Sequence, residues 1–129
     1  MGRRLGARGF VPDLILTSPT QRSLATGLII ASQLGVRERL VRFDNRLYNG
    51  ELQELLALLR ETPEMRRRIM LVGHHTGVSP LVSALTGQPM ENMPTCAMAC
   101  ISMDIDEWLQ LNPGEGKLSF YDYPKKVIG

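Results

Sequence analysis

Two segments constrain the fold most, because each joins an aliphatic run directly to a polar helix start. Residues 14–17 (LILT) and residues 69–73 (IMLVG) are short and rich in branched aliphatic side chains. Runs of this kind are typical of strands buried on both faces of a parallel sheet. The first run continues into residues 18–22 (SPTQR), and the second into residues 74–77 (HHTG). We therefore predict an α/β fold in which both junctions lie at the carboxyl edge of one sheet.

The first junction predicts a helix that starts at Ser18. Ser18 is expected to be the N-cap, with Pro19 at the first helical position and Gln21 completing a capping box. The helix should run to about Leu34 and end at Gly35, since glycine commonly follows the last helical turn.

The rest of the chain continues the alternation of strands and helices. Short or wholly apolar runs predict strands, and leucines spaced i, i+3, i+4, i+7 predict an amphipathic helix. A hairpin should close the chain. We therefore expect one domain over residues 1–129, with a three-layer α/β/α arrangement and a mostly parallel sheet that has an antiparallel strand. The expected elements are a strand at 41–44, a helix from Leu52 to near Pro63, a strand at 69–73, a helix from Val78 to about Leu85, and strands at 97–105 and 117–123.

The composition and charge of the chain exclude several classes of protein. With 43% apolar and 22% charged residues, the chain has the composition of a folded globule. A net charge of +2 is too small to indicate nucleic acid or an anionic membrane as the main partner. No apolar run reaches the roughly 18 residues of a membrane span. Cys96 and Cys100 fit no common zinc motif, so we expect small buried thiols in a reduced, cytoplasmic protein.

Arg22 and His74 are the candidate functional residues. Arg22 would lie in the opening turn of a helix, where the dipole disfavours a cation unless an anion is near. The planar guanidinium matches phosphate oxygens, although a surface ion pair with a glutamate such as Glu51 is the alternative. His74 ends a strand between Gly73 and Gly77, and it could donate to an oxyanion or serve as a structural histidine.

These segments also carry a resemblance to a known family. Residues 18–22, followed by Thr26, resemble the S-P-x-x-R-x-x-x-T block of the histidine phosphatase superfamily. Residues 72–77 (VGHHTG) are similar to its V-G-H-N-P-G block. Residues 47–48 with the leucine helix, and the apolar strand after residues 94–95, most resemble the short SixA-type phosphohistidine phosphatases.

The resemblance implies a phosphoglycerate-mutase-like fold and hydrolysis of a phosphomonoester or phosphoamidate through a phosphohistidine intermediate. Arg22 would match a phosphate-binding arginine, and His74 would match the second histidine of the catalytic pocket, which contacts the transferred phosphoryl group. No metal or organic cofactor is implied. The substrate would be a phosphorylated protein or a small phosphate ester. Glu51 is the candidate general acid, with a helix-start glutamate as the alternative for that residue.

The sequence departs from the family pattern in three places. His75 and Thr76 replace the usual Asn and Pro, and no Arg-His-Gly, which would carry the nucleophilic histidine, occurs in these 129 residues. The first strand of the family fold is therefore expected to be missing, which would leave sheet edges unpaired and promote self-association. We expect these residues alone to be inactive. A non-catalytic phosphate-binding module is the alternative function, and an α/β domain unrelated to phosphate is a third.

Overall fold

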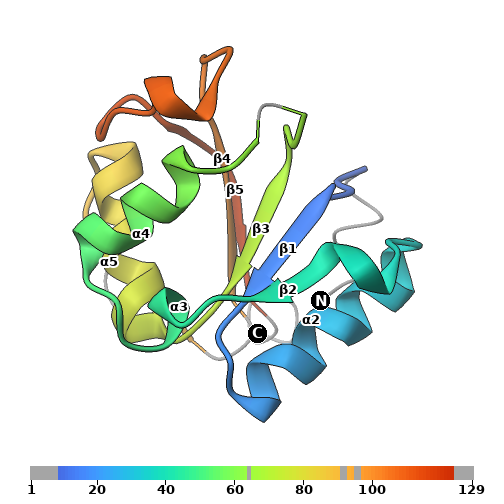
Figure 1. Ribbon diagram of the computed structural model, residues 1–129. Coiled ribbons are helices and arrows are strands. Elements are labelled where there is room, and N and C mark those ends of the chain that lie inside the picture. Colours follow the sequence, from blue (N-terminus) through green and yellow to red (C-terminus); the bar gives the residue numbers. More distant parts are fainter. Residues whose placement is uncertain (1–8, 64, 91–92, 95–96, 124–129) are drawn as a thin grey trace. The chain divides into compact units, whose positions relative to one another are not determined.

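The computed structural model describes residues 9–63, 65–90, 93–94 and 97–123. The chain forms two compact units (Figure 1). One comprises Met1–Gly50 and Met65–His74, and the other comprises Glu51–Glu64 and His75–Gly129. The expectation of a single domain stays a prediction. Among the described residues, no helix has the length and apolarity that crossing a membrane requires.

The first unit contains a three-stranded parallel sheet. Its strands are β1 (Leu14–Thr17), β2 (Val41–Phe43) and β3 (Ile69–Val72), in the order β2-β1-β3. Thr17, at the end of β1, is opposite the last residue of both neighbours, Phe43 and Val72. All three strands therefore end at one edge of the sheet (Figure 1). The predicted parallel pairing of the two aliphatic runs is confirmed.

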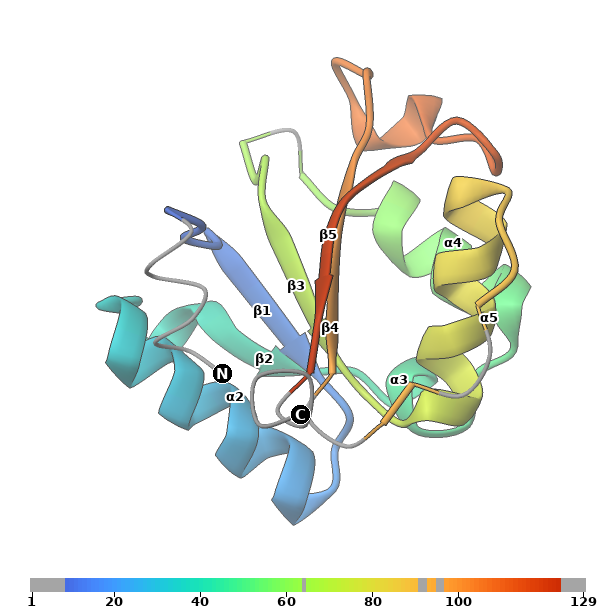
Figure 2. The ribbon, with the colours of Figure 1, turned by 180° about the vertical axis from the view of Figure 1, so that it is seen from behind.

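Helix α2 (Gln21–Leu34) packs closely against β1 (Figure 2). Gly27 permits this approach, because a Cβ atom there would lie 2.6 Å from the Thr17 methyl carbon. Ile30 and Ala31 of the same helix are buried. The helix ends at Gly35, whose φ of 72° is left-handed and suits glycine, as the sequence predicted.

The start of α2 differs from the prediction. Thr20, not Ser18, is the N-cap, and its hydroxyl oxygen accepts a hydrogen bond from the Ser23 amide at 3.3 Å. Ser18 stays paired to the sheet, since its amide donates to the carbonyl of the last β3 residue at 2.9 Å. Pro19 restricts the residue before it to extended backbone, which favours this extra strand pairing over helix. The predicted capping box of Ser18 is therefore wrong, and its hydroxyl is available for other contacts.

The second unit combines two helices with an antiparallel pair of strands. Strands β4 (Met98–Ser102) and β5 (Lys117–Asp122) form the predicted hairpin, with an irregularity between Cys100 and Ile101 (Figure 2). The helices are α4 (Leu52–Arg60) and α5 (His75–Thr86), and the short 3₁₀ turn η2 spans Trp108–Gln110. The mixed α/β class is confirmed.

Helix α5 starts three residues before the predicted Val78. The prediction placed the start at the first apolar residue, because the Gly-His-His-Thr-Gly segment carries no hydrophobic periodicity. A helix needs no apolar residue in its first turn, since its first four amide groups make no intrahelical bonds. Pro80 lies inside the helix.

Helix α4 has the amphipathic character that the sequence predicted. Its apolar face is buried, and Arg60 in its last turn reaches the Leu111 carbonyl with two nitrogens, at 3.1 and 3.0 Å. That carbonyl follows η2, so the arginine fixes η2 to the end of α4. The buried leucines of α4 are Leu55, Leu56, Leu58 and Leu59.

Candidate functional site

The candidate site begins where β1 and β3 end, inside the first unit. Ser18 directly follows β1, and His74 lies two residues beyond β3. Because these neighbouring strands are parallel and end in register, the two side chains meet: the Ser18 hydroxyl oxygen lies 3.3 Å from His74 Nε2. Ser18 has no exposed surface, whereas His74 is half-buried. Sequence spacing alone could not join residues that lie so far apart in the chain.

The Ser18 hydroxyl also contacts the start of α2. It donates to the Thr20 hydroxyl oxygen at 3.5 Å and accepts from the Thr20 amide at 3.4 Å. The Thr20 oxygen in turn accepts from the Ser23 amide. Hydrogen bonds therefore run from the first turn of α2 through Ser18 to His74.

Tyr48 forms the second contact of His74. The two rings meet edge to face, with centroids 5.6 Å apart and an angle of 81° between their planes. Pairs in this geometry are favourable beyond the apolar area they bury. Tyr48 lies on the short helix α3 (Arg46–Asn49), which follows β2 and which the sequence analysis did not predict. The sequence signal that could have identified Tyr48 as a site residue was its position just after a predicted strand, since ligands bind at the carboxyl ends of strands in α/β sheets.

An Asp44–Arg46 pair holds the turn between β2 and α3. The Asp44 carboxylate accepts from the Arg46 backbone amide at 2.9 Å and from Nε and Nη2 of its guanidinium at 3.0 and 2.9 Å. The Asp44 amide donates to the Thr17 carbonyl at 2.9 Å, which ties this turn to β1. The hydrogen bond from the Arg46 side chain is the main cause that lowers the pKa of Asp44 below its ordinary value of 3.8.

We expect Arg46→Ala to raise the pKa of Asp44 toward 3.8. The folded-state pKa is depressed, so the stabilisation by Asp44 is present above its unfolded value and is lost as pH falls through the folded pKa. The variant should therefore lose stability at pH 7 and lose less toward pH 2, because protonation of the carboxyl removes the charge that the Arg46 hydrogen bonds stabilise. Carboxyl NMR titration and urea unfolding at both pH values measure this. An unchanged Asp44 titration would contradict the assigned cause.

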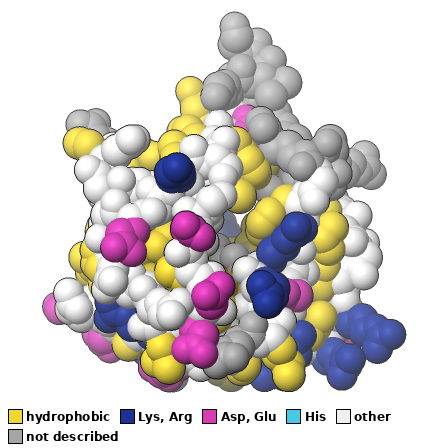
Figure 3. All heavy atoms as spheres, turned by 90° about the horizontal axis from the view of Figure 1, so that it is seen from above, with side chains coloured by type: hydrophobic (Ala, Val, Ile, Leu, Met, Phe, Trp, Pro, Cys, Tyr) yellow, Lys and Arg dark blue, Asp and Glu magenta, His cyan; other side chains and the backbone are white. Residues whose placement is uncertain are grey.

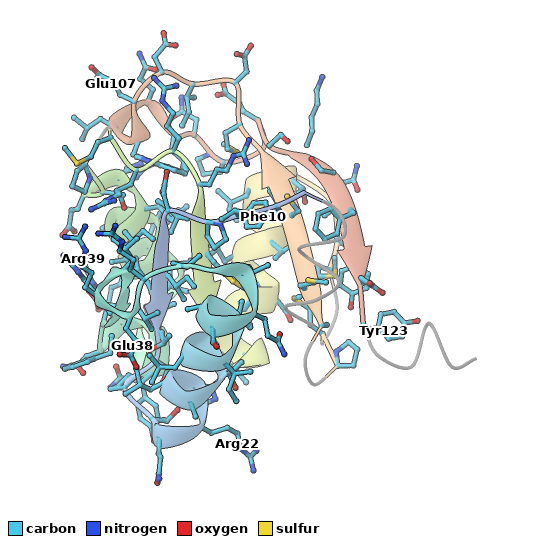
Figure 4. All side chains as sticks on the ribbon, turned by 90° about the vertical axis from the view of Figure 1, so that its right-hand side faces the viewer. Phe10, Arg22, Glu38, Arg39, Glu107 and Tyr123 are labelled. Atoms are coloured by element: carbon cyan, nitrogen blue, oxygen red, sulfur yellow. The ribbon has the colours of Figure 1, made fainter. Side chains whose placement is uncertain are left out.

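Arg22 lies in the first turn of α2, as predicted. Its side chain is exposed and extends away from the helix (Figure 4). Among the described residues, its guanidinium has no hydrogen-bond or salt-bridge partner, so the alternative of an ion pair with Glu51 is not observed. An unpaired cation beside the positive end of a helix dipole favours an anionic ligand. No hydrogen bond joins Arg22 to His74 within the described chain, and their convergence on one oxyanion stays a prediction.

Glu51, the candidate general acid, belongs to the second unit. It is the N-cap of α4 and forms a capping box with Glu54, whose carboxylate accepts from the Glu51 amide at 3.1 Å. This is the helix-start role that the sequence analysis left open as the alternative. A role for Glu51 in acid catalysis stays a prediction.

Of the two cysteines and the second histidine, the structure describes only the Cys100 side chain. Cys100 is half-buried in β4, and Cys96 lies outside the described residues. The side chain of His75 is likewise not described. Within the described part of the chain, no group of three or more His, Cys, Asp or Glu side chains is placed to hold a metal ion.

Comparisons with solved structures identify the fold. The chain has the fold of the SixA-type phosphohistidine phosphatases. A structure of the protein histidine phosphatase SixA with tungstate superimposes with a TM-score of 0.81, at 20% identity, over 98% of this chain and 78% of that one. SixA from Agrobacterium tumefaciens, described as a phosphohistidine phosphatase, gives a TM-score of 0.75 at 21% identity, over 95% of this chain and 75% of that one.

A third such protein, from Nakamurella multipartita, gives a TM-score of 0.72 at 19% identity, with 95% of this chain and 77% of that chain covered. No protein-family model matches the sequence, and no curated protein is detectably similar to it. The fold inferred from the two sequence blocks is therefore confirmed by structure, at 19–21% identity to these proteins.

Proposed function

We propose that this chain is a phosphohistidine-phosphatase-type domain whose Arg22 and His74 bind the phosphoryl group of a phosphorylated protein or a small phosphate ester. The observation that carries the proposal is the unpartnered, exposed Arg22 guanidinium at the start of α2, after the strand end where Ser18 meets His74. The fold shared with SixA proteins supports it, since one of them binds tungstate, a tetrahedral oxyanion like phosphate.

The proposed reaction transfers a phosphoryl group twice. A histidine nucleophile attacks phosphorus, the bond from phosphorus to the substrate nitrogen or oxygen breaks, and water then releases orthophosphate. Arg22 would pair two of its donors with phosphoryl oxygens, and the His74 imidazole would stabilise the charge that develops on them. We assign the nucleophile to neither His74 nor His75, so these 129 residues alone should bind phosphate without turning it over.

A non-catalytic phosphate-binding module is the second candidate. The same observation favours it, because an unpaired arginine and a half-buried histidine suffice for binding an anion. The two candidate functions predict different results for a longer chain that supplies a nucleophilic histidine. The phosphatase-type domain should then hydrolyse phosphohistidine, whereas the binding module should not.

The test is binding and turnover measured on the same protein. We expect calorimetry with tungstate and with orthophosphate to show saturable binding, and we expect no release of phosphate from a phosphohistidine-bearing protein by these residues alone. Sustained turnover would overturn the assigned inactivity. Absence of binding to both oxyanions would overturn both candidate functions.

For partners and location, we propose a protein or small-molecule phosphate in the cytoplasm, with no nucleic acid. Figure 3 draws acidic as well as basic side chains at the described surface. The net charge of +2 supports the same view.

We also propose self-association through strand edges. Among the described residues, β3 pairs with β1 alone and β4 pairs with β5 alone. An edge that presents unpaired backbone N–H and C=O groups is a template for another strand. We expect the average mass in sedimentation velocity and the midpoint of thermal unfolding to rise with protein concentration. A two-state unfolding transition of a monomer with a concentration-independent midpoint would contradict this.

A further inference from the structure

The buried hydroxyl of Ser18 binds no phosphoryl group in the proposed function, yet it lies against His74. A serine with no exposed surface beside a histidine is either a nucleophile or a group that positions the ring. Burial argues against the nucleophile, because a substrate atom has to reach the attacking oxygen. In addition, no described carboxylate bonds to His74 as the third member of a catalytic triad.

The hydrogen bonds around Ser18 favour one position for the proton of the His74 ring. A serine hydroxyl has one proton to donate and two lone pairs to accept with. Its proton goes to the Thr20 hydroxyl oxygen, and one lone pair takes the Thr20 amide. The remaining lone pair faces His74 Nε2 at 3.3 Å. This arrangement is satisfied when Nε2 carries hydrogen and donates to Ser18.

We propose that Ser18 is a positioning residue that holds His74 in the tautomer with its proton on Nε2. Tyr48 supports the same orientation from a second direction, since its ring meets the imidazole edge to face at 5.6 Å. The proposal rests on the proposed function for its catalytic meaning, but the tautomer itself is a property of the protein without ligand.

The consequence for the site is an imidazole whose orientation and proton placement are set before a ligand arrives. Nε2 keeps its hydrogen whether the ring is neutral or protonated and donates it to Ser18, so Nδ1 is the ring nitrogen left to gain a proton and donate to an oxyanion. Groups that are fixed before charge develops cost little reorganisation. Loss of Ser18 would leave the neutral ring free to adopt either tautomer.

The experiment measures the two ring nitrogens of His74 by ¹⁵N NMR at alkaline pH, without ligand. The wild-type protein should show hydrogen on Nε2. Ser18→Ala removes the acceptor, and Thr20→Val frees the Ser18 proton to donate to Nε2 instead. Both variants should shift the tautomer ratio toward Nδ1–H by roughly 3- to 10-fold, which is the effect of one hydrogen bond. Ser32→Ala, an exposed serine on the same helix, is the matched control and should shift nothing.

Each outcome decides the proposal. Hydrogen on Nδ1 in the wild-type protein, or an unchanged ratio in folded Ser18→Ala, would overturn it. Far-UV circular dichroism establishes folding, and Thr20→Val tests the same network if Ser18→Ala does not fold. A parallel titration with tungstate separates this proposal from the proposed function: the expected tautomer shift in a protein that binds no oxyanion would leave Ser18 as a positioning residue and reject the phosphate site.

Discussion

Replacing Arg22 by alanine is expected to weaken the binding of tungstate and orthophosphate by at least about tenfold. Hydrogen bonds to a charged partner contribute about 1.5–3 kcal/mol each, which corresponds to roughly 10- to 150-fold in affinity. The substitution should lower the affinity for oxyanions without lowering the stability of the protein. Arg22 is exposed and has no partner among the described residues, so its removal should change the free energy of unfolding by no more than about 0.5 kcal/mol. Calorimetry and urea unfolding measure the two quantities.

Arg39→Ala is the matched control for this variant. Arg39 is an exposed arginine in the short 3₁₀ helix η1 (Glu38–Leu40), which follows the far end of α2, and Figure 4 labels both arginines. The Arg39→Ala variant loses the same charge but leaves the first turn of α2 unchanged. Its affinity for tungstate and orthophosphate should therefore stay within about twofold of the wild-type affinity at the same ionic strength. Arg22→Lys keeps the charge but loses the planar fork and should bind with intermediate affinity. Equal loss in Arg22→Ala and Arg39→Ala would reduce the role of Arg22 to general charge.

The sequence sufficed to predict the elements whose signals are local. The aliphatic runs became β1 and β3, and Gly35 ends α2, because burial on both faces and a left-handed helix end each restrict residue type at the position itself. The two motif blocks also identified the fold, at an identity of 19–21% to the solved SixA structures.

The contacts of the site could not be predicted from the sequence, because they depend on the register in which the strands pair. Ser18 looked like a helix cap by its local pattern, but strand pairing kept it extended and the cap moved to Thr20. Tyr48 carried no helical or strand periodicity, and only the pairing of β1 with both neighbours brings it to His74. Local propensity is a weak preference that such tertiary pairing overrides.

Gly27→Val is expected to destabilise the first unit by about 3 kcal/mol, near the upper end of the cost of overpacking a core. A Cβ at residue 27 would lie 2.6 Å from the methyl carbon of Thr17, 3.3 Å from Val41 Cγ1 and 3.5 Å from Ile15 Cγ2. Thr17 and Ile15 are fully buried in β1, so neither can move aside. The helix must therefore shift from the sheet or the strands must deform, and the free energy of unfolding in urea should fall accordingly.

Ala25→Val separates this packing effect from the poor helix propensity of valine. Residue 25 is exposed on the same helix, so valine there should cost only about 0.5 kcal/mol. If Gly27→Val cost no more than Ala25→Val, close packing of α2 on β1 would not be what holds the helix. Because α2 also carries Thr20 and Arg22, a helix displaced from β1 should lose oxyanion affinity although every binding residue is still present. Folded Gly27→Val with wild-type tungstate affinity would show that the placement of Arg22 does not depend on this contact.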